Sequence, residues 1–388
     1  MKGMCPNCLK GRLSTFYQAQ EIPVHSVLLL VTETEALALP KGAINLGFCD
    51  HCGFISNTTF DARYNHYGDK YEATQGYSPT FNEFHQQLAN QLIKTYNLYA
   101  KKIIEIGCGQ GEFLDLLCRL GNNRGVGFDP VINSERTADK SENIKFIKDF
   151  YSVNYSNVQA DFICCKMTLE HLPATYQFLS EIRQAVDNQR NTVLFFQIPN
   201  TVRILEDCAF WDIYYEHCSY FTATSLNYLF QDTGYEVLET WTAYNNQYLM
   251  ITARPSLKTA SLVNQRSVQK TQKLVQAFKL KVNQAVAEWA SKIAQFKAAG
   301  QRIVLWGSGS KAVTFLNTLA LKDTIEYVVD INPYRQGTYI AGTGQMIKRP
   351  AFLTDYQPHH IIIMNPIYKK EIQQDLSKLG VVATLHCL

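Results

Sequence analysis

Short apolar runs alternate with segments of helical periodicity through the middle of the chain. Each run is long enough for one strand, and the segments between the runs are long enough for a helix. Strands separated by helices form parallel sheets with helices on both faces, so the pattern predicts an α/β fold. Ligands of such sheets collect at the carboxyl ends of the strands. The predicted strands are Ile103–Ile106, Gly125–Phe128, Phe162–Cys165, Thr192–Ile198 and Tyr248–Ala253.

A long amphipathic helix is predicted after these strands. From Val268 to Phe296, apolar residues recur at steps of three and four, which gives one apolar stripe over roughly eight turns. Ala299-Gly300 supplies a C-terminal stop signal. The polar face has no regular pattern of opposed charges, which favours packing against a domain of the same chain over a coiled-coil dimer.

A second unit of the same kind is predicted after this helix. The run Arg302–Trp306 leads into a glycine turn, and the next strand, Ile325–Val329, ends in an acid. This order of strand, glycine turn, helix, strand and acid predicts a second Rossmann-like unit. Its turns either bind a ligand or are kept for shape only. The candidate binding residues are Gly307, Ser308, Gly309, Asp330 and Asn365.

Two cysteine pairs mark the N-terminal part. Cys5 and Cys8, and Cys49 and Cys52, form two C-x-x-C pairs, which supply four thiolates for a closed, structural Zn²⁺ site. Free thiols or a redox pair are the alternatives. His51 is expected to be a bystander because four cysteines fill the site. The stretch 22–45 between the pairs is expected to form an inserted hairpin or loop.

A glycine-rich loop follows the first predicted strand. It reads Glu105-Ile-Gly107-Cys-Gly109-Gln-Gly111, and glycines there let the backbone turn sharply and approach a ligand. Asp129 ends the next strand, twenty residues after Gly109, which is typical of a carboxylate that binds a ribose. The spacing E-x-G-x-G-x-G resembles motif I of class I S-adenosylmethionine-dependent methyltransferases. That resemblance also predicts a contact of Asp149 with adenine.

The chemistry-bearing side chains are concentrated between Trp211 and Phe221. Tyr214, Glu216 and His217 place a phenol, a carboxylate and an imidazole within four positions. This set suits proton abstraction beside a carbonyl, with the histidine as base and the tyrosine donating to the enolate oxygen. The segment alternatively forms an aromatic core with two surface polar residues. His171, after the strand Phe162–Cys165, is a second acid–base group or a helix-capping residue.

In this order, the motifs resemble the sugar C-methyltransferase family over essentially the whole chain. The resemblance rests on the zinc cysteines and on the motifs E-I-G-C-G-Q-G, L-E-H, Y-Y-E-H-C-S-Y-F and V-V-D-I-N-P. The resemblance implies methylation of C3 of a nucleotide-linked 4-keto-deoxysugar with S-adenosylmethionine as methyl donor. It implies that His217 removes the C3 proton, that Tyr214 and Glu216 place the sugar or stabilise the enolate, and that His171 lies nearby.

The expected architecture is α/β, with a class I methyltransferase Rossmann-like domain between two other parts. The expected parts are a zinc-binding module (1–75), the methyltransferase domain (76–255), a linking amphipathic helix (256–300) and a Rossmann-like C-terminal domain (301–388) that binds a nucleotide sugar. A chain of 388 residues has ample material for two or three such cores.

Composition narrows the function further. A net charge of +3 disfavours a nucleic-acid substrate, and the N-terminus lacks the apolar region of a signal peptide. With eleven cysteines placed as they are, we expect a soluble, cytoplasmic protein that acts on a small molecule. Two other functions stay open: methylation of oxygen or nitrogen in another small molecule or RNA, and a non-catalytic, zinc-stabilised binding protein.

Overall fold

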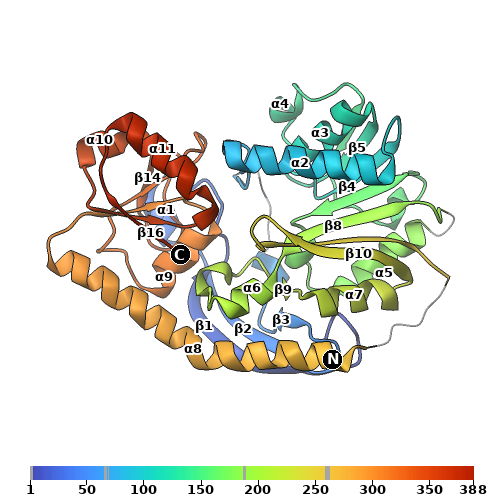
Figure 1. The fold of residues 1–388 in the computed structure, drawn as a ribbon, viewed down its shortest axis with the longest axis horizontal. Helices are drawn as coiled ribbons and strands as arrows, with labels where there is room; N and C mark the ends of the chain where they lie inside the picture. Colours follow the sequence, from blue (N-terminus) through green and yellow to red (C-terminus); the bar gives the residue numbers. More distant parts are fainter. Residues whose placement is uncertain (1–2, 65–67, 69, 187–188, 258–262) are drawn as a thin grey trace.

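Three β-sheets organise the chain, which we describe from a computed structural model (Figure 1). The structure describes residues 3–64, 68, 70–186, 189–257 and 263–388. Parts of the predicted zinc module (1–2, 65–67 and 69) and of the predicted linking segment (258–262) therefore lie outside the described residues. Within the described ranges, no helix is both long and apolar enough to cross a lipid bilayer.

The N-terminal sheet is antiparallel and has the order β1-β2-β3-β9. Its strands are β1 (Leu13–Pro23), β2 (Lys41–Cys49), β3 (Ile55–Asn57) and β9 (Ser219–Tyr220). The stretch between the cysteine pairs is thus a hairpin, with the short helix α1 (Glu33–Leu37) in its connection. Strand β9 belongs to the middle of the chain and directly follows His217, so it attaches the candidate catalytic segment to this sheet.

The central sheet has the order β10-β11-β8-β7-β4-β5-β6. Its strands are β4 (Lys102–Ile106), β5 (Arg124–Phe128), β6 (Ile144–Ile147), β7 (Phe162–Lys166), β8 (Val193–Pro199), β10 (Tyr235–Ala243) and β11 (Tyr248–Pro255). The neighbours from β6 to β8 are parallel. The expectation that Tyr248–Ala253 continues the parallel sheet is wrong, because β11 forms a hairpin with β10 and pairs antiparallel with β8.

Helices cover both faces of the central sheet, as the sequence pattern predicts. Helices α2 (Pro79–Tyr96) and α3 (Glu112–Gly121) bury their apolar sides with Ile103, Phe162 and Phe195 on one face. Helices α5 (Thr175–Ala185) and α7 (Ala223–Asp232) pack with Ile104 and Phe196 on the other. Two shorter helices, α4 (Ser134–Thr137) and α6 (Thr201–Glu206), follow β5 and β8.

The C-terminal sheet is parallel and has the order β14-β13-β12-β15-β16. Its strands are β12 (Ile303–Trp306), β13 (Tyr327–Val329), β14 (Met346–Lys348), β15 (His360–Ile363) and β16 (Thr384–Cys387), and its helices are α9 (Ser310–Thr318), α10 (Leu353–Tyr356) and α11 (Lys369–Leu379). The predicted second Rossmann-like unit is therefore confirmed. In both large sheets the strand order reverses beside the strand that precedes the glycine turn, β4 or β12, which is where such sheets bind ligands.

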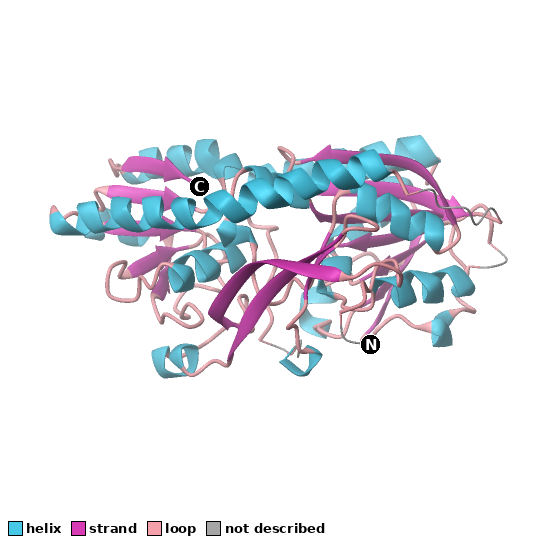
Figure 2. Ribbon diagram, turned by 90° about the horizontal axis from the view of Figure 1, so that it is seen from below, coloured by secondary structure: helices cyan, strands magenta, loops and turns pink. Residues whose placement is uncertain are grey.

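Helix α8 (Gln265–Ala298) runs along the molecule from the N-terminal sheet to the C-terminal sheet (Figures 1 and 2). Val268, Val275 and Phe278 of its apolar stripe are buried in one core with residues of β1, α6 and α9. The Phe278 ring meets the rings of Phe16 and Tyr17 edge to face, with ring centroids 6.1 and 5.5 Å away. The stripe packs within its own chain, as the missing charge pattern predicts.

Candidate active site

A cavity of about 1040 Å³ lies where the carboxyl ends of the central and C-terminal sheets face each other. The loops after β4, β5, β7 and β8 line one side, and the loops after β12, β13 and β15 line the other. Most of the predicted site residues line it: Glu105, Gly107, Gly109, Asp129, Asp149, His171, Tyr214, Glu216, His217, Gly307, Gly309, Asp330 and Asn365. Gly111 and Ser308 do not.

The glycine loop after β4 needs glycine for two different reasons. Gly107, Gly109 and Gly111 all have positive φ, at 70°, 56° and 77°. A Cβ on Gly107 would collide with Thr168, and one on Gly111 would collide with the Phe146 ring. At Gly109 a Cβ would meet no protein atom within 4 Å and would project into open space. Gly107 and Gly111 are therefore required because neighbouring side chains leave no room for a Cβ, whereas Gly109 keeps space free at the cavity.

Asp129 and Asp149, the two acids predicted to bind the donor, accept hydrogen bonds from nearby residues. The Asp129 carboxylate accepts hydrogen bonds from Gly109 N at 2.8 Å and from Val131 N at 2.9 Å. Asp149 accepts one from the Tyr155 hydroxyl at 2.6 Å. Each carboxylate oxygen has two lone pairs, so both acids keep acceptor capacity toward the cavity.

Glu105 sits deeper, at the end of β4. It is buried, and burial raises the pKa of its carboxyl to about 7. Lys166, at the end of neighbouring β7, is also buried, and its pKa is lowered by burial. The Lys166 ammonium lies 2.9 Å from His85 Nε2 and 3.7 Å from the Phe113 ring centroid. Both Glu105 and Lys166 line the cavity.

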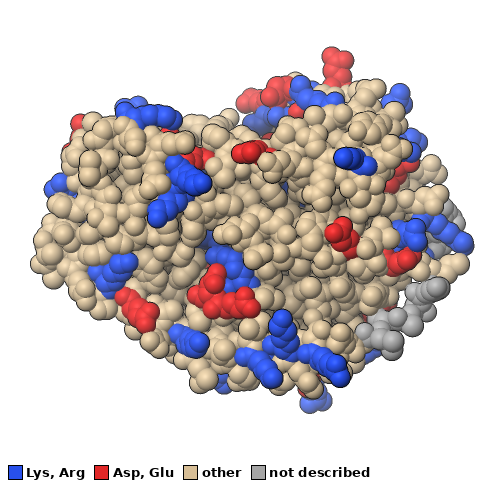
Figure 3. All heavy atoms as spheres, in the orientation of Figure 1, with Lys and Arg blue, Asp and Glu red and all other residues tan. Residues whose placement is uncertain are grey.

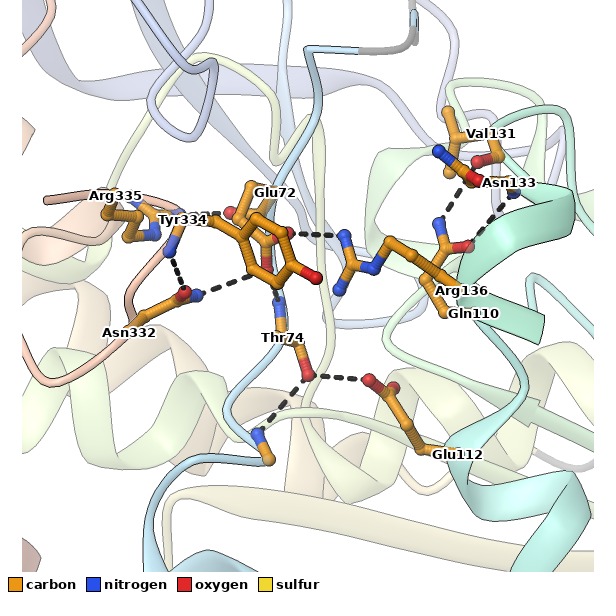
Figure 4. Close-up of polar contacts among 11 residues, drawn as sticks. Glu72, Thr74, Gln110, Glu112, Val131, Asn133, Arg136, Asn332, Tyr334 and Arg335 are labelled. Atoms are coloured by element: carbon orange, nitrogen blue, oxygen red, sulfur yellow. Dashed lines mark hydrogen bonds and ion pairs between the residues drawn. The ribbon is translucent and has the colours of Figure 1, made fainter. Parts of the chain in front are cut away.

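Residues 71–78, which we call the strap, line the cavity between the central sheet and the C-terminal sheet (Figure 4). Glu72 is buried, and its carboxylate accepts hydrogen bonds from Arg136 Nη1 at 2.5 Å and Asn332 Nδ2 at 3.1 Å. Arg335 donates to the Glu72 carbonyl oxygen. Thr74 donates to Glu112 at 2.7 Å, one residue beyond the glycine loop. The strap therefore fastens the donor side of the cavity to the C-terminal sheet.

The candidate catalytic segment begins with a 3₁₀ turn, Phe210–Asp212, and ends at β9. The His217 ring lies against the rings of Tyr214 and His171, with ring centroids 4.0 and 4.7 Å away. Burial lowers the pKa of both imidazoles and raises that of the Tyr214 phenol. Near neutral pH the histidines are therefore uncharged and the phenol keeps its proton. This is the pairing that proton abstraction beside a ketone needs.

Glu216 is held by two residues of the loop that follows β1. Its carboxylate accepts hydrogen bonds from Ser26 N at 3.0 Å and from the Ser26 hydroxyl, and His25 Nδ1 lies 3.4 Å from Oε1. The Ser26 hydroxyl also lies 2.7 Å from Ser310 Oγ at the start of α9. Glu216 thus joins the N-terminal and C-terminal parts at the cavity wall.

A second contact between domains, at Asp212, lies near Glu216. Asp212 is buried between two cations, Arg203 Nη1 at 2.7 Å and the ammonium of Lys311. All three side chains line the cavity. Although burial alone would raise the pKa of the Asp212 carboxyl, Lys311 and Arg203 hold it below the usual value. The C-terminal domain therefore places a charged side chain within the catalytic segment.

The remaining predicted binding residues of the C-terminal domain make internal contacts. Ser308 donates to Asp330 Oδ2 from its backbone N at 2.7 Å and from its hydroxyl at 2.6 Å. This repeats the Gly109 to Asp129 contact of the central sheet. Asn365 exchanges two amide hydrogen bonds with Gln247, at 3.0 and 2.9 Å, so it joins the two large sheets.

The four N-terminal cysteines come together away from the cavity. All four are buried, and their sulfur atoms lie within 4.8 Å of one another. Cys5 and Cys52 are 3.7 Å apart and Cys8 and Cys49 are 3.8 Å apart, too far for disulfides. Sulfurs bound tetrahedrally to Zn²⁺ at about 2.3 Å lie about 3.8 Å from one another, so the spacing fits zinc. His51 lies outside this set, against Tyr228.

Sequence reasoning missed the residues that act across domains. Four such residues belong to no recognised motif, and each meets its partner only after folding. They are Ser26, Glu72, Arg136 and Lys311. Lys311 carried a weak signal, because it directly follows the second glycine turn. On the face shown in Figure 3, acidic and basic side chains are interspersed, as expected for a net charge of +3.

Two protein-family models match the chain, one over the methyltransferase domain and one over the C-terminal part. Residues 80–240 match the model of a methyltransferase domain, and residues 249–382 match that of a C-methyltransferase C-terminal domain. The C-methyltransferase NovU of Streptomyces niveus is 21% identical over 287 residues, which is 70% of this chain and 67% of that protein.

Solved methyltransferase structures match a smaller share of the chain. The 1,6-didemethyltoxoflavin-N1-methyltransferase of Burkholderia thailandensis is 15% identical, with a TM-score of 0.37, over 47% of this chain and 82% of that one. The magnesium protoporphyrin IX methyltransferase of Synechocystis PCC 6803 is 12% identical, with a TM-score of 0.35, over 46% and 84%.

Proposed function

The chain is an S-adenosylmethionine-dependent methyltransferase of the C-methyltransferase family, and we propose that it methylates a carbon next to a ketone, C3 of a nucleotide-linked 4-keto-deoxysugar. One observation carries the proposal: a single cavity holds the glycine loop, the Tyr214, His171 and His217 rings, and the turns of a second Rossmann-like sheet. A methyl donor, a base and a bulky acceptor each have a place in it.

The donor half of the site is the loop after β4 with the acids that follow β5 and β6. S-adenosylmethionine, when bound, supplies an electrophilic methyl group on a sulfonium. Gly109 leaves room for close approach, and Asp129 and Asp149 offer carboxylate oxygens for ribose and adenine. Gly107 and Gly111 keep the loop packed on Thr168 and Phe146.

The base is His217. A neutral imidazole accepts the proton α to the ketone, and the electron pair of the broken C–H bond stays on the acceptor as an enolate. Tyr214, whose pKa is raised by burial, keeps its proton and donates a hydrogen bond to the enolate oxygen. His171 packs edge-on against His217 and fixes the plane of its ring. The enolate carbon then takes the methyl group, helped by proximity within the cavity.

The acceptor half is formed by the turns after β12, β13 and β15. Gly307, Gly309 and Asp330 line the cavity opposite the glycine loop, and we assign them to the nucleotide part of the acceptor. Ser308 supports this half from behind through Asp330, and Asn365 lines it and is held by Gln247. The cysteine set would hold a structural Zn²⁺, because four sulfurs fill its coordination shell and leave no position for a substrate.

The test is exchange of the α-proton. The protein is incubated in deuterated water with 4-keto-deoxysugar nucleotides and S-adenosylmethionine, and we expect deuterium uptake at C3 and formation of S-adenosylhomocysteine. His217→Asn should lower both at least 100-fold. His359→Asn is the matched control, because His359 is exposed and outside the cavity. Methyl transfer without loss of the α-proton, or with full activity in His217→Asn, would assign the protein to oxygen or nitrogen acceptors instead.

A further inference from the structure

Glu170 is a buried carboxylate that the proposed mechanism leaves unused. It lies in the 3₁₀ turn Leu169–His171 after β7 and is 1% exposed. Within the described part of the chain, neither carboxylate oxygen has a hydrogen-bond partner. Native proteins satisfy nearly all buried polar groups, so an orphaned carboxylate beside the candidate base needs a functional explanation.

A group that can carry the opposite charge, the candidate base, lies close by. Glu170 Oε1 is 4.0 Å from His217 Nε2. The two segments are fastened together by the backbone, because Cys218 N donates to the Glu170 carbonyl oxygen at 3.0 Å. A separation of 4.0 Å is slightly too long for a hydrogen bond, and such catalytic contacts commonly tighten when substrate binds.

We propose that Glu170 is a positioning residue for His217, whose carboxylate stabilises the imidazolium formed when His217 takes the α-proton of the acceptor. The inference rests on the function proposed above. In the step, the acceptor C–H bond breaks, its electron pair becomes the enolate, and the proton bonds to His217. Because Nε2 faces Glu170, Nδ1 is the ring nitrogen that receives the proton. Glu170 stays anionic and offsets the new positive charge.

The two acids of the candidate catalytic segment, Glu216 and Asp212, already have other partners. The Glu216 carboxylate faces Ser26 and His25, although Glu216 is the direct chain neighbour of His217. Asp212 is neutralised by Arg203 and Lys311. The carboxylate that faces His217 without another cation is Glu170, as far as the described residues show. An imidazolium formed in this buried place without it would have no counter-charge.

Ionisation of Glu170 should make the activity depend on pH. Burial raises the pKa of this carboxyl to about 8. The groups that face it are His217 and His171, the Tyr214 and Tyr248 phenols, and the Cys165 and Cys218 thiols. All are neutral near pH 8, since burial lowers the histidine pKa values and raises the others. Activity should therefore rise as Glu170 ionises, and level off above about pH 8.

A metal ion would exclude this role. Glu170, His171 and His217 each place one donor atom within 4.8 Å of the others, a spacing that a divalent cation could span. Such an ion would bind Nε2 of His217, so the neutral ring would carry its own proton on Nδ1 and could accept no other there. Activity that disappears on removal of a metal beyond the cysteine site, and returns with Zn²⁺ or Ni²⁺, would overturn the inference.

The experiment compares Glu170→Gln with the wild type. The amide keeps the shape of the side chain but carries no charge, and Glu142→Gln on an exposed loop is the matched control. We expect unchanged S-adenosylhomocysteine affinity, α-proton exchange lowered about 100-fold, and loss of the rise in kcat/KM toward pH 8. Unchanged exchange with the wild-type pH profile would overturn the inference, as would a loss of affinity or Tm with kcat intact.

A second readout needs no acceptor, so it separates this inference from the proposed function. In protein labelled with ¹³C at histidine, the His217 resonance is assigned through its absence in His217→Asn and titrated with pH. In the wild type the His217 resonance should shift near pH 8, where the facing Glu170 carboxyl ionises, and this step should be absent in Glu170→Gln. A wild-type resonance without the step, or a step that persists in Glu170→Gln, would overturn the inference, whatever the acceptor is. The step in a protein that exchanges no ketone would support the pairing and reject the proposed function.

Discussion

Replacing Gly109 by alanine separates the two reasons for glycine in the loop after β4. Its φ of 56° costs an alanine about 1 kcal/mol, and a Cβ there meets no protein atom within 4 Å. A shift of about 2–4 °C in Tm is therefore expected for a domain of this size. Because Gly109 lines the cavity and no protein atom fills the space beside it, the new methyl group should compete with the donor, and S-adenosylhomocysteine should bind at least tenfold more weakly, which calorimetry measures.

Two further alanine variants make the comparison quantitative. Gly300 has a similar φ of 68° and equally open surroundings at the end of α8, so Gly300→Ala should lose the same stability and keep full affinity. Gly111→Ala adds a collision with the Phe146 ring to its backbone strain, for a total of roughly 2–5 kcal/mol. Wild-type affinity in Gly109→Ala would refute the placement of the donor at this loop.

Three further substitutions test the contacts between domains and the cysteine site. Glu72→Gln leaves Arg136 without its buried partner, so differential scanning calorimetry should show a loss of about 3 kcal/mol, and wild-type stability would contradict the role of the strap. Cys49→Ser should lower the zinc content measured by atomic emission and the Tm together, and a zinc-free wild type of equal stability would reject the metal. Lys311→Met leaves Asp212 with Arg203 alone; we expect the acceptor KM to rise more than tenfold, and an unchanged KM would show that Lys311 is only structural.

Local patterns predicted most of the fold because they act over a few residues. An apolar run followed by a glycine-rich turn identified β4 and its loop, and the same order identified β12. Strands β6 and β10 were missed, since both lie at sheet edges and their side chains are partly exposed. The antiparallel direction of β11 depends on its hairpin with β10. Because the edge strand β10 was missed, the direction predicted for its neighbour β11 was also wrong.

The candidate site was predictable only where its residues share a motif. Tyr214, Glu216 and His217 are within four positions of one another, so the sequence could group them. The contacts of Ser26 with Glu216 and of Asn332 with Glu72 join residues 190 and 260 positions apart. No periodicity extends over such separations, because only the packed sheets bring these side chains together.

These long-range contacts explain why the reaction would need the whole chain. An enolate in an open site is quenched by water more often before it meets a methyl group, so the reaction favours a cavity with limited access for water. The middle part of the chain supplies the base, but Ser26, from the loop after β1, holds Glu216, and Ser310 of α9 contacts Ser26. The C-terminal sheet adds Lys311 to Asp212, and Asn332 to the strap. A methyltransferase domain cut free of its two neighbours would keep the glycine loop and could bind the donor, but its base would face water.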